Sequence, residues 1–125
     1  MIKVDYRTII GKSWEEMLSA DFVALISNPH FLGDQTIKTQ HFVGCGRWIQ
    51  KSETEITGHH QLRVAHQRYT DESLSTVTIK GHAHGTAIFD FRKVDGGWKF
   101  AGLTPNIRWS ECDYDKMFGP PPAHQ

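Results

Sequence analysis

Four long segments with the alternation of β-strands, joined by short polar turns, constrain the fold of this chain more than any other feature. From the positions of the turns, the segments are expected at residues 37–50, 55–70, 74–93 and 97–109. The last turn, Asp95-Gly96-Gly97, is typical of a tight hairpin, so neighbouring segments are expected to pair antiparallel. Sheets of long strands twist and curl. The sequence therefore predicts a curved sheet whose concave face is lined by alternate residues.

A strand and a helix are expected before the four long segments. Alternation over residues 3–10 indicates a strand with one wet face. The residues on its apolar face are Val4, Tyr6, Thr8 and Ile10. Ser13 and Glu16 have the spacing of a helix capping box, and Ser19 opens a segment with helical spacing of apolar residues. Pro29, after an asparagine, is expected to end that helix.

Strand, helix and then a meander of long strands define an α+β fold in which a curved antiparallel sheet wraps around a pocket. Gly44 and Gly46 are expected to mark a bulge or bend in the first long strand. A chain of 125 residues is long enough for one domain with a buried core, which we expect at residues 1–118. Ser110 is expected to begin a short helix before a disordered tail at residues 119–125.

The charge balance favours a small-molecule ligand. Lys and Arg together number 14, as do Asp and Glu, so the sequence gives no sign of a nucleic-acid or membrane partner. The polar start has no apolar signal-peptide core and no segment is long enough to cross a bilayer, so a cytoplasmic location is expected. Cys45 and Cys112 have no metal-type spacing and are expected to be free thiols in a reducing compartment.

Two of the eight histidines are candidates for chemistry. His66 shares its predicted strand face with Leu62, and His41 shares its face with Thr39 on the neighbouring strand. Either histidine alone is more often a hydrogen-bonded core residue than a catalyst. Together, and with Tyr6 also predicted to point inward, they indicate a pocket that can bind a carbonyl group and transfer a proton beside it.

The other histidines and the tryptophans have structural interpretations. His82 and His84 form an H-x-H pattern, but no third ligand of matching strand parity is expected, so we interpret them as outer-face residues at a subunit contact. His59 and His60 are adjacent and face opposite ways, which excludes a shared site. Three tryptophans at strand positions are expected to fill cores: Trp48, Trp98 and Trp109.

Several long runs of this sequence closely resemble the scytalone dehydratase family. They are TQHFVGCGRW, GHHQLRVAHQRYTD, VTIKGHAH and DGGWKFAGLTPNIRW, and the resemblance extends from Val4 to Phe118. It implies the cone-shaped α+β barrel of the nuclear transport factor 2 type and a trimer formed through the outer faces of the sheets. It also implies a lyase that removes water from hydroxylated naphthalenones, in fungal melanin or related secondary-metabolite biosynthesis, without metal or coenzyme.

The resemblance implies roles for individual residues. Tyr6 matches a tyrosine that holds a water polarising the substrate carbonyl. His41 matches a histidine that takes the α-proton and assists departure of the hydroxyl. His66 matches a histidine that orients the substrate and a water. The implied apolar pocket residues are Leu25, Phe31, Leu62, Val64, Leu103, Pro105 and Ile107. Two C-terminal aromatics that close the family's pocket match Tyr114 and Phe118.

The sequence also departs from the family's pattern. Gly85 and Ala87 stand where the family has a pocket serine and asparagine, and with Ala83 they predict a wider, less polar cavity floor. Alternatively, these small residues merely relax a bent strand. The family also has a helical segment before the first strand, with a tyrosine and an aspartate that pairs with the catalytic histidine. No counterpart of this segment is expected in a chain whose first strand begins next to Met1.

Several functional interpretations stay open at this stage. The start codon is misassigned or the chain is truncated, or the short form is real and its wider pocket serves a bulkier polyketide. In the second case the reaction is a dehydration, an isomerisation or a ring closure. Two further alternatives are a homologue that binds a ligand without turnover, and an assembly role in which a partner chain covers the exposed concavity.

Overall fold

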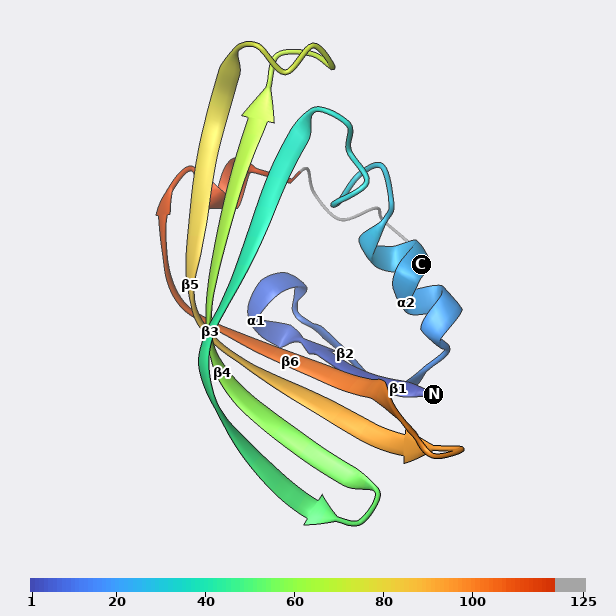
Figure 1. Cartoon of the computed structure of the whole chain (residues 1–125). Helices are drawn as coiled ribbons and strands as arrows, with labels where there is room; N and C mark the ends of the chain where they lie inside the picture. Colours follow the sequence, from blue (N-terminus) through green and yellow to red (C-terminus); the bar gives the residue numbers. More distant parts are fainter. Residues whose placement is uncertain (119–125) are drawn as a thin grey trace.

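A computed structural model describes residues 1–118, which form one six-stranded sheet with short helices (Figure 1). In chain order the elements are β1 (Ile2–Tyr6), α1 (Arg7–Ile10), β2 (Lys12–Met17), α2 (Ser19–Ile26), β3 (Ile37–Ser52), β4 (Glu55–Tyr69), β5 (Val77–Val94), β6 (Gly97–Cys112) and the 3₁₀ helix η1 (Tyr114–Lys116). The strand order in the sheet is β2-β1-β6-β5-β4-β3. The tail expected at residues 119–125 lies outside the described residues.

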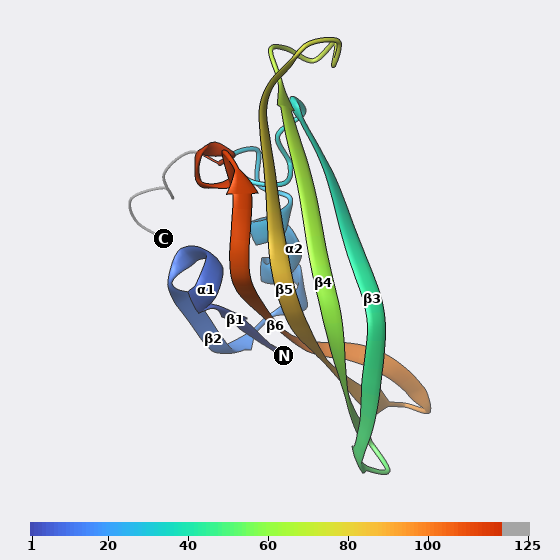
Figure 2. The same cartoon turned by 90° about the vertical axis from the view of Figure 1, so that its left-hand side faces the viewer.

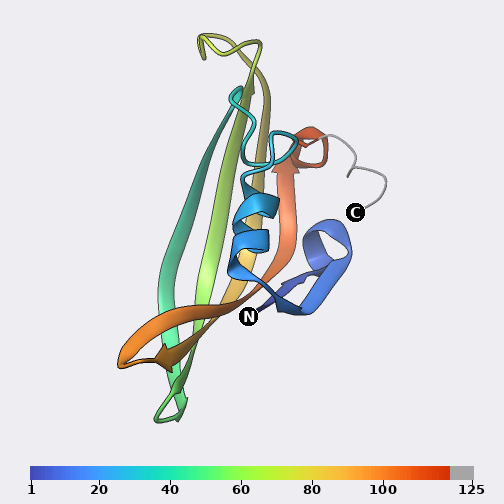
Figure 3. The same ribbon diagram turned by 90° about the vertical axis from the view of Figure 1, so that its right-hand side faces the viewer.

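The four predicted long strands are confirmed, and they form a bent wall. Strands β3 to β6 pair antiparallel in sequence order, while β1 pairs with β6 in parallel and makes the sheet mixed. The wall curves around α2, which lies across its concave side (Figures 1 and 3), and the view in Figure 2 shows the length of β3, β4 and β5. The predicted α+β fold with a curved sheet is confirmed, and its shape is consistent with a cone-shaped barrel.

Bulges at glycines produce part of this curvature. The β3–β4 register shifts between Val43 and Gly46, where the sequence predicted a bend. The β5–β6 register shifts at Gly85, where a Cβ would lie 1.9 Å from the carbonyl oxygen of Asn106. Gly85 is therefore required by the close approach of two backbones. This favours the interpretation of Gly85 as a strand-bending residue over that of a cavity floor.

The predicted hairpin between β5 and β6 is confirmed. Asp95 and Gly96 adopt φ angles of 51° and 81°, so both central residues lie in the left-handed region that a tight two-residue hairpin requires. Glycine meets this requirement without steric cost, and aspartate tolerates it better than most residues.

The strand expected at residues 3–10 was too long, since β1 ends at Tyr6 and Arg7–Ile10 form the short helix α1. The carboxylate of Asp5 accepts hydrogen bonds from the backbone N–H of Arg7 at 3.2 Å and from its guanidinium at 2.9 Å. This local bonding competes with strand geometry and turns the chain. Thr8 Oγ1 then donates to the carbonyl of Pro105 at 3.0 Å, which holds α1 on β6.

The capping box predicted at Ser13 and Glu16 was also wrong, because both residues lie in β2. Gly11 adopts a left-handed φ of 71° after α1 and reverses the chain, so that β2 pairs antiparallel with β1. The helix predicted to begin at Ser19 is confirmed as α2, which ends at Ile26, shortly before Pro29.

The C-terminal helix expected from Ser110 was wrong in its start and its length. Strand β6 continues to Cys112, because Ser110 pairs with Ala83 and Cys112 pairs with Gly81 on β5. Only Tyr114–Lys116 are helical, as the 3₁₀ turn η1.

The tryptophans expected in the core are instead exposed. The exposed fractions of Trp48, Trp98 and Trp109 are 56%, 42% and 55%. The shift at Gly85 explains Trp109, because the extra residue in β6 places this side chain opposite His84 on the outer face, where the two rings stack at 3.7 Å.

The apolar core consists of two adjoining clusters. The first contains Ile2, Val4, Tyr6 and Met17, and the second contains Leu62, Val64, Ala83 and Ala87. Leu103 packs against both, so the core is continuous from β1 across the sheet to β4. No helix in residues 1–118 is long and apolar enough to span a membrane.

Replacement of Gly81 by alanine is expected to lower the free energy of unfolding by about 1–3 kcal/mol. A Cβ at Gly81 would lie 2.6 Å from Tyr114 Cα, so η1 would have to move away from β5. The matched control is Gly97→Ala, whose nearest neighbour is the carbonyl oxygen of Val94 at 3.8 Å. Urea unfolding measures both variants, and equal stabilities would contradict this account of η1.

Candidate active site

The structure brings His41 and His66 together on the concave face of the sheet. In the β3–β4 ladder Thr39 is opposite His66 and His41 is opposite Val64, so all four side chains share one face. The centroids of the two imidazole rings are 6.1 Å apart and the rings are nearly perpendicular, at 83°. Two histidines expected on neighbouring strands are therefore neighbours in space.

His66 is enclosed, whereas His41 is accessible. Only 3% of His66 is exposed, while His41 lies on the edge strand β3 and is exposed to solvent. The ring of His66 is near those of Tyr114, at 6.0 Å, and Phe118, at 5.1 Å. Its Nδ1 is 2.7 Å from Thr39 Oγ1. Strand alternation placed Thr39 on this face, but the hydrogen bond depends on the exact register, which the sequence did not specify.

Both histidines are uncharged at neutral pH. Burial is the main cause that lowers the pKa of His66 to about 4, and the neighbouring imidazoles of His41 and His82 make smaller contributions in the same direction. The part of the His41 ring that contacts protein is shielded from water, and this partial burial lowers its pKa as well. A neutral imidazole has one N–H donor and one lone pair, so each ring can donate or accept a proton without first losing one to solvent.

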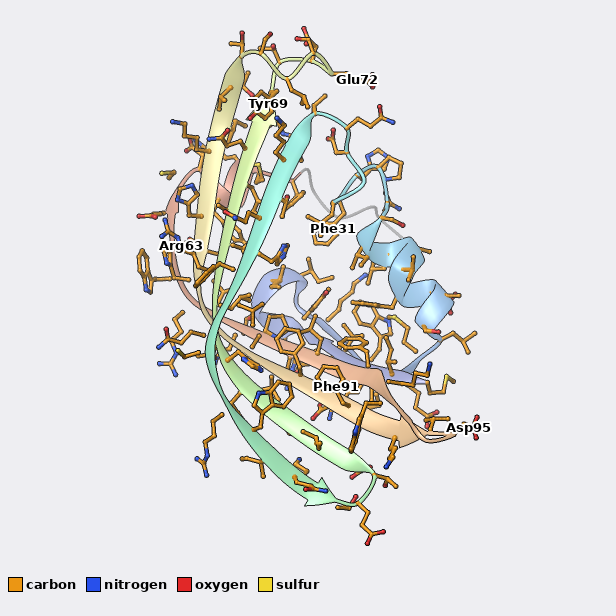
Figure 4. The ribbon with its side chains drawn as sticks, viewed as in Figure 1. Phe31, Arg63, Tyr69, Glu72, Phe91 and Asp95 are labelled. Atoms are coloured by element: carbon orange, nitrogen blue, oxygen red, sulfur yellow. The ribbon has the colours of Figure 1, made fainter. Side chains whose placement is uncertain are left out.

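Aromatic residues from the segment between α2 and β3 and from the C-terminal part of the described chain close the end of the concave face near His66. The rings of Phe31 and Phe118 are 4.7 Å apart, and Figure 4 shows Phe31 directed toward the concave side. Arg68 holds these two segments, because its Nε donates to the carbonyl of Met117 at 3.2 Å and its Nη1 donates to Asp34 at 2.9 Å. The predicted closing residues Tyr114 and Phe118 therefore both lie beside His66.

Tyr6 is buried in the first core cluster. It is 7% exposed, and its ring centroid is 6.4 Å from that of Phe22 on α2. Burial raises the pKa of its phenol to about 12, so the hydroxyl stays protonated and is able to donate a hydrogen bond. Leu25, also predicted for the pocket, packs against this same cluster.

The remaining predicted pocket residues either belong to the second cluster or lie next to it. Leu62, Val64 and Ala87 are 8%, 6% and 0% exposed and form its buried centre. Leu103, Ile107 and Tyr114 pack against it. Pro105 is buried opposite Ala87, and Gly85 lies opposite Ile107 at the bulge. The chain thus supplies an apolar wall next to the two imidazoles.

His82 and His84 lie on the outer face, as the sequence predicted. Glu111, a neighbour that sequence reasoning missed, accepts hydrogen bonds from His82 Nδ1 and His84 Nε2, each at 3.1 Å. The bonds from His84 and His82 lower the pKa of Glu111. In the part of the chain that the structure describes, no group of three or more His, Cys, Asp or Glu side chains is arranged to hold a metal ion.

A hollow of about 360 Å³ also lies on this outer face, away from the two imidazoles. It is lined by Gln40, Phe42, Arg63 and Ala65, whose strand parity is opposite to that of His41 and His66. Figure 4 shows Arg63 on the convex side of the wall. This hollow contains no pair of histidines comparable to His41 and His66, so it offers no acid–base chemistry of that kind.

The curved sheet and its helices define a nuclear transport factor 2-like α+β protein. The hexachlorocyclohexane dehydrochlorinase LinA-type3 of Novosphingobium barchaimii has this fold, with a TM-score of 0.67 and 14% sequence identity, over 96% of this chain and 74% of that chain. A family model described as scytalone dehydratase matches residues 1–122. The chain therefore belongs to the scytalone dehydratase family.

Named relatives agree with this assignment. The chain is 56% identical to a dehydratase of Pestalotiopsis microspora over 118 residues, which are 94% of this chain and 74% of that protein. It is 50% identical to a scytalone dehydratase of Pyricularia oryzae over 117 residues, 94% of this chain and 68% of that protein. The family resemblance found in the sequence is confirmed, and family membership supports a dehydratase-like activity.

The buried His66 is expected to make stability fall with decreasing pH. Its folded pKa of about 4 lies below the ordinary value of 6.5, so its stabilising contribution is complete above pH 6.5 and is lost as the pH falls toward 4. Full loss corresponds to roughly 3 kcal/mol. Urea unfolding of the unmodified protein and His66→Gln at several pH values measures this contribution. Parallel pH curves for the two proteins would contradict it.

Proposed function

We propose that the chain is a lyase that removes water from a hydroxylated bicyclic aromatic polyketide of the naphthalenone type. The reaction would take place in the cytoplasm, in fungal pigment or secondary-metabolite biosynthesis, and would use acid–base catalysis by the chain's own side chains without a cofactor. The observation that carries the proposal is the pair of neutral imidazoles, His41 and His66, on the apolar concave face. Family membership supports the reaction type.

In this proposal the accessible His41 is the base. Its lone pair accepts the proton on the carbon next to the substrate carbonyl, and the C–H electron pair becomes the new C=C bond. The C–O bond to the adjacent hydroxyl breaks, and the proton on His41 passes to the departing oxygen. One water leaves and the imidazole returns to its neutral form, so the side chains need no external acid.

His66 and Tyr6 would act by hydrogen bonding. The enclosed His66 holds a substrate oxygen and limits its motion, which lowers the entropic barrier to reaction. Tyr6 stays protonated because its pKa is about 12, so it can donate to a water that polarises the carbonyl. The apolar wall of Leu62 and Val64 and the rings of Phe31 and Phe118 suit a flat aromatic body.

Replacement of His41 or His66 by alanine is expected to reduce turnover of scytalone by roughly 10²–10⁴-fold, because each variant removes one acid–base or orienting group. Loss of water from scytalone is followed by mass spectrometry. His59→Ala is the matched control, since His59 is exposed with the opposite strand parity and is expected to leave turnover unchanged. Circular dichroism checks that each variant is folded.

The outcomes of this experiment separate the alternatives. Retained turnover in both alanine variants would remove the proposed mechanism. A folded protein without turnover, but whose tryptophan fluorescence is quenched by aromatic polyketides, would support a noncatalytic binding homologue. Conversion of another polyketide without loss of water would support an isomerase or cyclase.

We further propose that the outer face of the sheet forms the contact of a homo-oligomer, most simply a trimer. Phe42 on β3 and Trp109 on β6 are 62% and 55% exposed on this face, and aromatic side chains are enriched in interfaces. Light scattering after size exclusion is expected to show a trimer that Phe42→Glu dissociates. Val23→Glu, on the exposed side of α2, is the control and should remain a trimer. A monomeric unmodified protein would contradict this assembly.

A further inference from the structure

The hydroxyl of Thr39 is the hydrogen-bonding partner of the His66 ring within residues 1–118. Thr39 and His66 are directly opposite in the β3–β4 ladder, and Thr39 Oγ1 is 2.7 Å from Nδ1. The backbone pairing fixes both side chains at once, so this contact is built into the sheet. The ring of His66 is 3% exposed and packed among aromatic rings, which leaves it little freedom to turn.

The length of this hydrogen bond favours one of the two atoms as the donor. An N–H group that donates to oxygen is most often about 2.9–3.0 Å from it, within a range of about 2.7–3.2 Å. The separation of 2.7 Å between Thr39 Oγ1 and His66 Nδ1 is at the short end of this range, so we assign the threonine hydroxyl as the donor and Nδ1 as the acceptor. A neutral imidazole whose Nδ1 accepts a hydrogen bond carries its one proton on Nε2.

We propose that Thr39 is a positioning residue that holds His66 in its Nε2–H tautomer, so that Nε2–H is the donor to a substrate oxygen. Nε2 is further from the backbone than Nδ1 and projects from the sheet into the concave side. It has no protein hydrogen-bond partner among residues 1–118 and is free to bind a ligand oxygen. This inference rests on the proposed function and deepens it.

A fixed tautomer gives the two histidines different roles. In the proposed reaction His41 needs a lone pair to accept a proton from carbon, while the substrate oxygens need a donor. With the opposite tautomer, His66 would present a second lone pair to those oxygens and would repel them. Thr39 thus determines that His66 is the donor, and the accessible His41 takes the part of the base.

Two variants of Thr39 separate the effect of its hydroxyl from the effect of its methyl group. Thr39→Val keeps the shape of the side chain and removes the hydroxyl, whereas Thr39→Ser keeps the hydroxyl and removes a methyl group. The ¹⁵N chemical shifts of the histidine rings report which nitrogen carries the proton, and comparison with His66→Ala assigns the His66 signals among the eight histidines. This measurement needs no substrate and is possible on the unmodified protein, even if Thr39→Val fails to fold.

The expected result is a bare Nδ1 and a protonated Nε2 on His66 in the unmodified protein and in Thr39→Ser. Thr39→Val is expected to show a mixture of tautomers and to lower kcat/KM on the order of tenfold, as loss of one hydrogen bond predicts. An Nδ1–H tautomer in the unmodified protein, or unchanged ¹⁵N shifts in Thr39→Val, would overturn the assignment. Unchanged kcat/KM despite a mixed tautomer would overturn the positioning role.

Failure of this inference is distinguishable from failure of the proposed function. If the protein turns over no polyketide but the ¹⁵N shifts follow the expected pattern, the proposed reaction fails and the control of the tautomer by Thr39 stands. If turnover depends on His41 and His66 but Thr39→Val has the shifts and kcat/KM of the unmodified protein, the reaction stands and the role of Thr39 fails.

Discussion

The register of β3 against β4 is the constraint on which the candidate site depends. It places Thr39 opposite His66 and His41 opposite Val64, so the acid–base pair and the hydrogen bond beside it follow from one set of backbone bonds. A shift by one residue would turn His41 to the outer face, because strand side chains alternate. Strand β4 is also paired with β5 and would keep its own faces, so such a shift would take His41 away from His66.

The glycines adapt this regular ladder to a curved wall with a site inside it. At Gly85 the backbone of β6 approaches so closely that a side chain has no room, and the extra residue in β6 moves Trp109 to the outer face. Gly81 gives η1 room to lie against β5 next to His66. The small residues that differ from the family's polar ones are therefore explained in part by backbone packing.

Alternation and turn signals in the sequence were sufficient to predict the long strands, the final hairpin and the sharing of a face by the two histidines. These features depend on residues close together in the chain. Helix α1, the outward position of Trp109 and the contact between Glu111 and the outer histidines were not predicted from the sequence. The position of Trp109 depends on a register shift and the contact of Glu111 on the pairing of β6 with β5, so neither follows from a local pattern. Helix α1 begins with local bonds between Asp5 and Arg7, but the bond that holds it on β6, from Thr8 to Pro105, is long-range.

The position of β3 at the edge of the sheet has a consequence for how the site is lost. Within residues 1–118, strand β3 is paired on one side only, whereas β4 lies between two neighbours. Edge strands open locally at a lower free energy than strands in the interior of a sheet. Fraying of β3 would carry Thr39 and His41 away from His66 while β4, β5 and β6 stay paired. The candidate arrangement of His41 and His66 therefore has a lower stability of its own than the fold that supports it.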